Sequence, residues 1–152
     1  MLYFEDFQVG QVFELGSRTL SEEEIIEFAK EFDPQPFHID PEKAKDSFFG
    51  GIVASGWHTC AVYMRLLVDN FASKASSLGS PGVDDLRYLK PVHPGDTLRA
   101  RFTIAETIPT KSRPDRGLLK ARAEMLNQHD EPVLSFISLG FFGRHPVEEE
   151  HR

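Results

Sequence analysis

Hydrophobic residues recur at helical spacing in two stretches of the chain. The first begins at Ser21, which together with Glu24 has the sequence of a capping box. Its apolar stripe consists of Ile25, Ile26, Phe28, Ala29 and Phe32. The second runs from about Ser55 to Ala72 and has apolar residues on most of its circumference. We therefore expect an amphipathic helix that ends at Asp33 and a long helix that is mostly buried.

Alternation of hydrophobic and polar residues, the pattern of a half-buried strand, predicts strands near residues 11–15 and 98–104. Further strands are expected near residues 86–89, 118–126 and 133–142. A short helix is expected over 41–46, because Asp40 and Pro41 have the sequence of an N-cap followed by a first-turn proline. A long helix followed only by strands suggests a sheet wrapped around it, and the pattern supports the α+β class.

The ten residues 32–41 lie between the first helix and the short one, and they contain three prolines. Prolines disfavour helix in the residue before them, so we expect a stiff, non-helical loop in which Asp33, Gln35 and Asp40 are extended or in turns. If the loop curls back, the Asp33 carboxylate and the His38 imidazole can share one water or one substrate proton, as in acid–base catalysis. The alternative is that Asp33 only ends the helix and His38 is a buried, satisfied ring.

Length and composition restrict the class of protein further. A chain of 152 residues with 40% hydrophobic residues and 13 Phe is expected to form one domain with a Phe-rich core. Its net charge of −7 argues against nucleic acid as a partner. Cys60 is the single cysteine, so no intrachain disulfide is possible. With neither a signal pattern nor an apolar run long enough to span a membrane, we expect a cytoplasmic protein.

The sequence Asp33-x-x-Pro36-Phe37-His38 after a helix resembles the hydratase motif of the MaoC-like dehydratase, or (R)-specific enoyl-CoA hydratase, family. That motif is usually Asp-x-Asn-Pro-hydrophobic-His, so Gln35 stands where Asn is expected. Residues 54–59 resemble the family's small-residue helix start, and residues 89–96 resemble its strand turn. The resemblance implies a hot-dog domain over residues 1–144, in which a curved antiparallel sheet wraps one long helix. Residues 145–152 are expected to form a flexible acidic tail.

The resemblance also implies a reaction, the reversible hydration of trans-2-enoyl-CoA to (R)-3-hydroxyacyl-CoA. Asp33 and His38 would be the acid–base pair that binds the water. The backbone N–H of Gly56, at the positive start of the long helix, would polarise the thioester carbonyl as an oxyanion hole. Coenzyme A enters only as part of the substrate, and no other cofactor is expected.

Alternatives remain open at this point. A hot-dog thioesterase would use a carboxylate to activate water against the carbonyl carbon, and a non-catalytic protein would only bind acyl-CoA. Gly56 could instead serve close packing between helix and sheet. Acyl chain length and branching cannot be read from the sequence.

Two further expectations concern binding partners. Lys111, Arg113 and Arg116 concentrate positive charge in an acidic protein, so this loop is a candidate for binding the coenzyme A phosphates, although it could equally be a solvated loop. A single wrapped sheet leaves an exposed edge, and the family commonly pairs its domains, so we expect a homodimer or a higher homo-oligomer.

The other reactive residue types are weaker candidates. His58 could line a pocket, but a structural or surface role is favoured, and Cys60 on the apolar stripe is expected to be a small core residue. His38, Asp40 and His58 lack the compact spacing of metal ligands, so no metal is expected.

Overall fold

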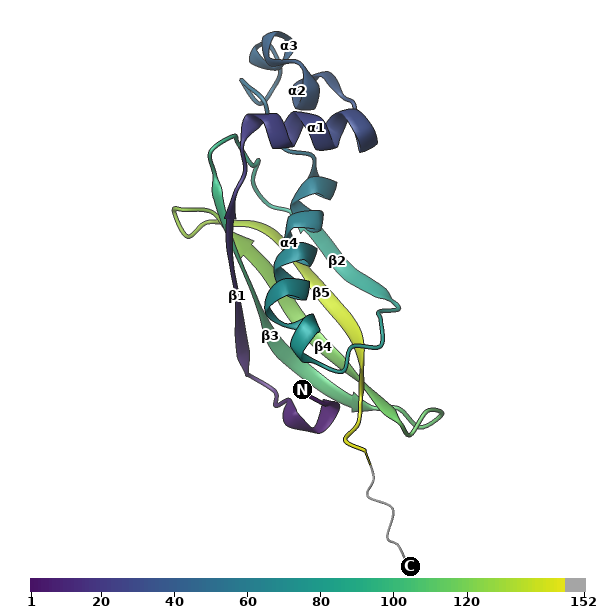
Figure 1. Cartoon of the computed structure of the whole chain (residues 1–152). Coiled ribbons are helices and arrows are strands. Elements are labelled where there is room, and N and C mark those ends of the chain that lie inside the picture. The colour runs from purple at the N-terminus through teal and green to yellow at the C-terminus, as the bar shows by residue number, and fades with distance from the viewer. Residues whose placement is uncertain (147–152) are drawn as a thin grey trace, which may run out of the picture.

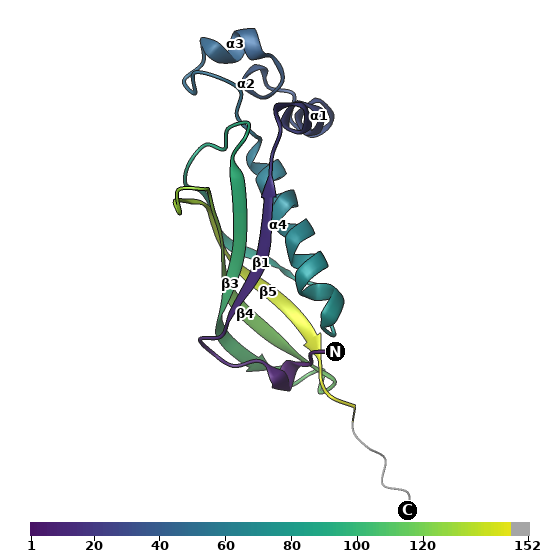
Figure 2. The same ribbon diagram turned by 60° about the vertical axis from the view of Figure 1, so that its left-hand side comes forward.

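An antiparallel sheet curved around one helix dominates the computed structural model, which describes residues 1–146 (Figures 1 and 2). In this part of the chain the sheet has five strands, in the order β1-β3-β4-β5-β2. The strands are β1 (Val12–Thr19), β2 (Gly82–Tyr88), β3 (Thr97–Pro109), β4 (Arg116–Leu126) and β5 (Pro132–Gly143). The helix inside the curve is α4 (Gly56–Asn70). The α+β class and the wrapped helix expected from the sequence are confirmed.

Three short helices, α1 (Glu22–Phe32), α2 (Pro36–Ile39) and α3 (Pro41–Lys45), gather beyond the N-terminal end of α4 (Figure 1). Ser21 and Asp40 cap their helices as predicted, but the Glu24 side chain pairs with Arg18 rather than completing the predicted capping box. Ser21 Oγ accepts a hydrogen bond from the Glu24 N–H at 3.1 Å, and Asp40 caps α3 by accepting from the N–H of Glu42 at 3.0 Å. The 3₁₀ turns η1 (Phe4–Asp6) and η2 (Ala72–Lys74) lie near the opposite end of the sheet.

The predicted non-helical loop is wrong at residues 36–39, which form the single helical turn α2. Pro36 is the first residue of this turn, where its missing N–H is not needed and its fixed φ suits a helix. The expectation holds for the flanking residues, because Gln35 (φ −78°, ψ 145°) and Asp40 (φ −125°, ψ 104°) are both extended. This helical turn reverses the chain direction, as the prolines suggested, and brings His38 back toward Asp33.

The core fills the space between α4 and the concave face of the sheet, and it is rich in Phe as expected. One face of α4 buries His58, Thr59, Val62, Tyr63 and Leu66. Phe rings from η1, the strands and the end of α4 meet at the far end of the core, where Phe71 and Phe102 pack edge to face with centroids 4.8 Å apart. This packing makes the sheet and α4 a rigid base for the three short helices.

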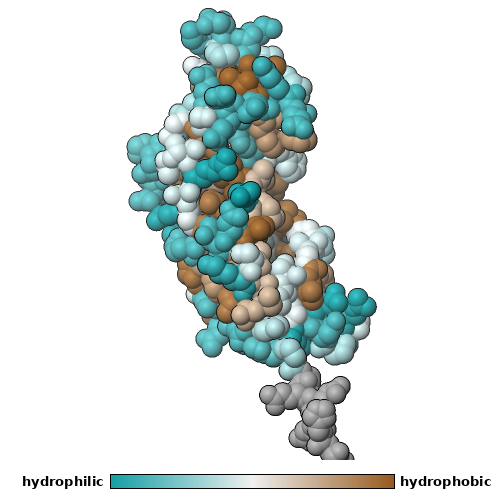
Figure 3. Space-filling view, viewed as in Figure 1, coloured by the Kyte–Doolittle hydropathy of each residue, from teal (hydrophilic) through white to brown (hydrophobic). Residues whose placement is uncertain are grey.

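Both edges of the sheet are unpaired in the described chain, at β1 and at β2. Most residues of β2 are exposed. Beside it, α4 exposes three large apolar side chains: Trp57 is 61% exposed, Met64 52% and Val68 43%. Figure 3 shows hydrophobic side chains reaching the surface along the middle of this face. An edge strand next to an apolar helix face is a surface that another chain can cover.

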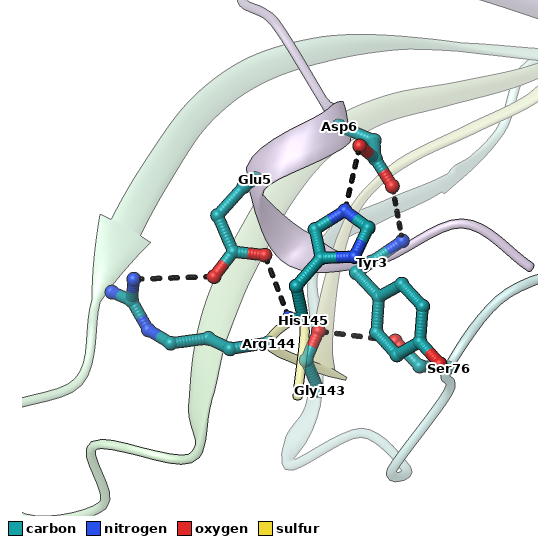
Figure 4. Close-up of polar contacts among 7 residues, drawn as sticks. All are labelled: Tyr3, Glu5, Asp6, Ser76, Gly143, Arg144 and His145. Atoms are coloured by element: carbon teal, nitrogen blue, oxygen red, sulfur yellow. Dashed lines mark hydrogen bonds and ion pairs between the residues drawn. The ribbon is translucent and has the colours of Figure 1, made fainter. Parts of the chain in front are cut away.

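The two ends of the described chain are tied together by polar contacts (Figure 4). The Glu5 carboxylate accepts from the backbone N–H of His145 at 3.0 Å, and the His145 ring lies 3.0 Å from Asp6 Oδ1. His145 is the first residue of the predicted flexible tail, and these contacts hold it against η1. Of the predicted tail, residues 147–152 lie outside the described residues.

The Tyr63 hydroxyl is buried and finds no hydrogen-bond partner within residues 1–146. An unsatisfied buried hydroxyl costs roughly 1–3 kcal/mol. We therefore expect Tyr63→Phe to raise the free energy of unfolding by about 1 kcal/mol, measured by urea denaturation. As a control, Leu15→Ala in the same core should lower it by about 2–5 kcal/mol. A Tyr63→Phe variant less stable than the parent would show that the hydroxyl is satisfied after all.

Candidate functional site

Asp33 and His38 meet beside the N-terminus of α4. Asp33 follows the last residue of α1, and the turn of α2 carries His38 back toward it, so that His38 Nε2 lies 3.3 Å from Asp33 Oδ2. The predicted pairing of these two side chains is thus present in the structure. The residues between them supply the turn rather than any further chemistry, with the exception of Gln35.

The His38 ring is held in one orientation. It is 6% exposed, and its Nδ1 lies 2.6 Å from the carbonyl oxygen of Val53. Because a carbonyl oxygen can only accept, Nδ1 carries the hydrogen and donates it. In the uncharged ring, Nε2 is therefore an acceptor, and it faces the Asp33 carboxylate. Two acceptors at this separation can hold one water that donates a hydrogen to each.

The Asp33 carboxylate receives a donor on each oxygen. Gln35 Nε2 donates to Oδ1 at 2.7 Å, and Ser55 Oγ donates to Oδ2 at 2.7 Å. Partial burial raises the pKa of Asp33, but the hydrogen bonds from Gln35 and Ser55, together with His38, outweigh it, so the net pKa is lowered. Asp33 is consequently a carboxylate at neutral pH.

Ser55 is a site residue that the sequence identified only as the approximate start of the long helix. It is fully buried, and its Oγ accepts from the Trp57 N–H at 3.3 Å while donating to Asp33. One hydroxyl therefore caps α4 and orients the carboxylate. A Ser before a helix gives a signal for the cap, but nothing in the local sequence points to Asp33, which is 22 residues earlier.

Gly56 is the first residue of α4, where a helix leaves its backbone N–H without an intrahelical acceptor. The Tyr88 ring occupies the space that a side chain here would need, since a Cβ on Gly56 would come within 2.3 Å of a ring carbon. The alternative of close packing is therefore real, although the packing partner is a strand side chain. It is compatible with an N–H that binds an oxygen.

A cavity of about 390 Å³ reaches two of these groups. His38 and Gly56 both line it, and its remaining walls are mostly apolar, with Phe37, Phe49 and Leu89 among them. A ligand in this cavity meets the imidazole and the start of α4 together. The arrangement combines a water-binding pair, a helix N-terminus and an apolar wall.

His58 and Cys60 lie close by without joining the acid–base pair. The His58 ring stacks on Phe28 of α1, with centroids 4.5 Å apart and planes 7° apart, and burial lowers its pKa. That contact agrees with the favoured structural role. Cys60 is partly buried against the core, and burial raises the pKa of its thiol, which weakens its reactivity.

Arg113 and Arg116 lie at the opposite end of the sheet from Asp33, in the connection between β3 and β4 and at the start of β4 (Figure 1). Arg116 pairs with Asp115 at 3.1 Å. The structure does not bring either arginine to the Asp33–His38 pair of the same chain, so their contact with coenzyme A phosphates stays a prediction.

The described residues offer neither a cluster of metal ligands nor a helix able to span a membrane. Within residues 1–146, no group of three or more His, Cys, Asp or Glu side chains is arranged to hold a metal ion. None of the helices in this same range combines the length and the hydrophobicity needed to cross a membrane.

The wrapped sheet, the single long helix and the pair at its start define a hot-dog protein. The sequence matches the family described as MaoC like domain over residues 6–118, and the chain belongs to that family. The resemblance drawn from residues 33–38 is confirmed.

Individual relatives agree with this assignment. The uncharacterized protein YdeM of Bacillus subtilis is 35% identical over 130 residues, which are 85% of this chain and 90% of YdeM. An (R)-specific enoyl-CoA hydratase of Rhodospirillum rubrum is 30% identical over 114 residues, 72% of this chain and 74% of that enzyme. The crystal structure of a MaoC-like dehydratase, also from Rhodospirillum rubrum, superposes with a TM-score of 0.91 at 40% identity, covering 97% of this chain and 100% of that one.

The hydrogen bond from Gln35 stabilises the charged form of Asp33, so its removal should raise the Asp33 pKa. We expect Gln35→Ala to shift the carboxyl titration of Asp33, followed by NMR, to higher pH. Because the pKa of Asp33 is lower in the folded protein than in the unfolded chain, the stability that the charged Asp33 contributes is present above its unfolded pKa. That stability is lost as the pH falls through its folded pKa. Gln8→Ala, on an exposed amide elsewhere, should change nothing. An unaltered Asp33 titration in Gln35→Ala would contradict the assignment.

Proposed function

We propose that the protein catalyses the reversible addition of water to a trans-2-enoyl thioester, giving a 3-hydroxyacyl thioester. The observation that carries this proposal is the Asp33–His38 pair at 3.3 Å, beside the free N–H position at the start of α4. Family membership supports the reaction class, and the likeness to an (R)-specific enoyl-CoA hydratase favours coenzyme A as the carrier and the R product.

The chemistry follows from the protonation states of the pair. Asp33 stays ionised, so His38 Nε2 is the group that can accept a proton from the bound water while the carboxylate holds the other hydrogen. The water oxygen bonds to C3, and the π electrons move toward the thioester oxygen. The Gly56 N–H stabilises the negative charge there. The imidazolium then gives its proton to C2, which restores the pair and completes the addition of one water.

Hydrolysis of the thioester is the competing reaction, and it would require attack on C1 instead. The imidazole that accepts the proton of the water is well placed to return it to carbon, which a thioesterase does not need. A protein that only binds acyl-CoA would not need an ionised carboxylate with a donor on each oxygen. We therefore favour hydration over thioester hydrolysis and over binding without catalysis.

Substitution of the pair tests the reaction. Asp33→Asn and His38→Ala should each lower kcat/KM for crotonyl-CoA by about 10²–10⁴. The double variant should lose far less than the product of the two, because groups that act together are non-additive. The assay follows loss of the enoyl absorbance and, separately, release of free thiol.

The outcomes separate the alternatives. Folded single variants within a few-fold of the parent would remove Asp33 and His38 from the mechanism. Release of thiol without hydration would identify a thioesterase, and binding of crotonyl-CoA without any turnover would identify a binding protein.

We also propose that the protein forms a homodimer through the edge strand β2 and the exposed face of α4. Main-chain groups on the outer side of β2 can pair with a second copy, and Trp57, Met64 and Val68 supply apolar area beside it. Both features lie on one continuous face.

Light scattering at micromolar concentration should give twice the mass of the chain. Met64→Glu should shift the protein toward the monomer, because it buries a charge in the interface. Glu42→Lys on the exposed α3 serves as the control and should leave the mass unchanged. A strictly monomeric parent protein would contradict the dimer.

A further inference from the structure

A second cavity, of about 400 Å³, lies between α4 and the sheet. Its walls are almost entirely apolar, and Leu67, Phe71 and Leu119 are among the residues that line it. This cavity shares the first turn of α4 with the site cavity. Gly56 and Thr59 face the site cavity, whereas Trp57 and Cys60 face the second one.

Tyr88 stands at the boundary between the two cavities. Its ring lies against Gly56, where an added Cβ would be 2.3 Å from a ring carbon, and its hydroxyl is 4.0 Å from Cys60 Sγ. The chain crosses the same boundary here: Leu86 lines the second cavity, and Leu89 lines the site cavity. The Tyr88 ring therefore separates the group that would hold the thioester from the apolar space beneath α4.

The ring is held by contacts that can be broken. Tyr88 is 49% exposed, and its closest polar neighbour is a thiol at the outer limit of hydrogen bonding. Burial, Cys60 and the negative charge of Asp33 raise the Tyr88 pKa to about 12, so the phenol is uncharged at neutral pH. An uncharged ring on an edge strand can pack beside a hydrocarbon chain or turn away from it.

We propose that Tyr88 sets the length of the acyl chain that the site accepts. With the ring in place, the acyl group is confined to the site cavity and must be short. Without it, a longer chain extends from the thioester at Gly56 into the apolar cavity under α4. The inference rests on the proposed function for the identity of the ligand as an acyl thioester. The occupant is the substrate's own chain because Cys60, which lines this cavity, lies 4.0 Å from the hydroxyl of Tyr88, which lines the site cavity. Core residues such as Phe102 line its deeper part.

The test compares crotonyl-CoA with trans-2-decenoyl-CoA in the full-length protein. In Tyr88→Ala, kcat/KM for the decenoyl substrate should rise relative to crotonyl-CoA by about tenfold or more, the discrimination that a hydrophobic pocket gives for one to a few methylene groups. Tyr88→Phe keeps the ring and should leave the ratio unchanged. Adding Ala121→Leu to Tyr88→Ala refills the second cavity and should bring the ratio back.

A binding measurement keeps this inference separate from the proposed reaction. Calorimetry with butyryl-CoA and decanoyl-CoA, which cannot be hydrated, should show the same shift toward the long chain in Tyr88→Ala. If the parent protein binds these ligands but hydrates nothing, the proposed function fails while the role of Tyr88 is still decided by the binding ratio. An unchanged ratio in folded Tyr88→Ala would overturn the inference. So would an equal shift in Tyr88→Phe. Trp57, Met64 and Val68 line the outer part of this cavity and also belong to the proposed dimer face, so both measurements are made on the protein in its own oligomeric state.

Discussion

The carboxylate of Asp33 joins the parts of the molecule that make the site. It lies at the end of α1, accepts from Ser55 at the start of α4, and faces His38 on α2. The end of α1, the turn α2 and the start of α4 are thus joined by polar contacts at one point. Because charged hydrogen bonds in a partly buried setting are stronger than neutral ones, these contacts add to the apolar packing of the helical layer, in which Ile25 and Ala44 are fully buried.

The layer of short helices lies on the N-terminal end of α4, which is itself held in place inside the curved sheet (Figure 1). The N-terminus of α4 must approach the ligand closely, and Gly56 allows both that approach and the contact with Tyr88. The same residue therefore meets a requirement of packing and a requirement of chemistry. The two roles that were open for Gly56 from the sequence are combined in the structure.

Much of the fold followed from local signals. Ser21 and Asp40 cap helices as predicted, and each strand of the described chain overlaps a stretch that was expected to be a strand. The misses have tertiary causes. α2 is a single turn stabilised by its place between α1 and α3. β2 begins at Gly82, before the predicted start, because residues 82–84 pair with β5, and the register then shifts between Asp84 and Arg87, where Asp85 has a positive φ of 53°. Asp33 and His38 could be predicted as a pair because both lie within one stretch of ten residues, 32–41. Ser55 and Tyr88 could not, since only the fold brings them to the site.

Gln35 shows how the chain orders the carboxylate without the Asn of the motif. It lies two residues after Asp33, and its side chain, one methylene longer than Asn, bends back to Oδ1 at 2.7 Å. Gln35 is exposed, however, so water competes for this hydrogen bond. Ser55 is fully buried and meets no such competition at Oδ2. The orientation of Asp33 therefore depends more on the start of α4 than on the residue at which this chain departs from the motif.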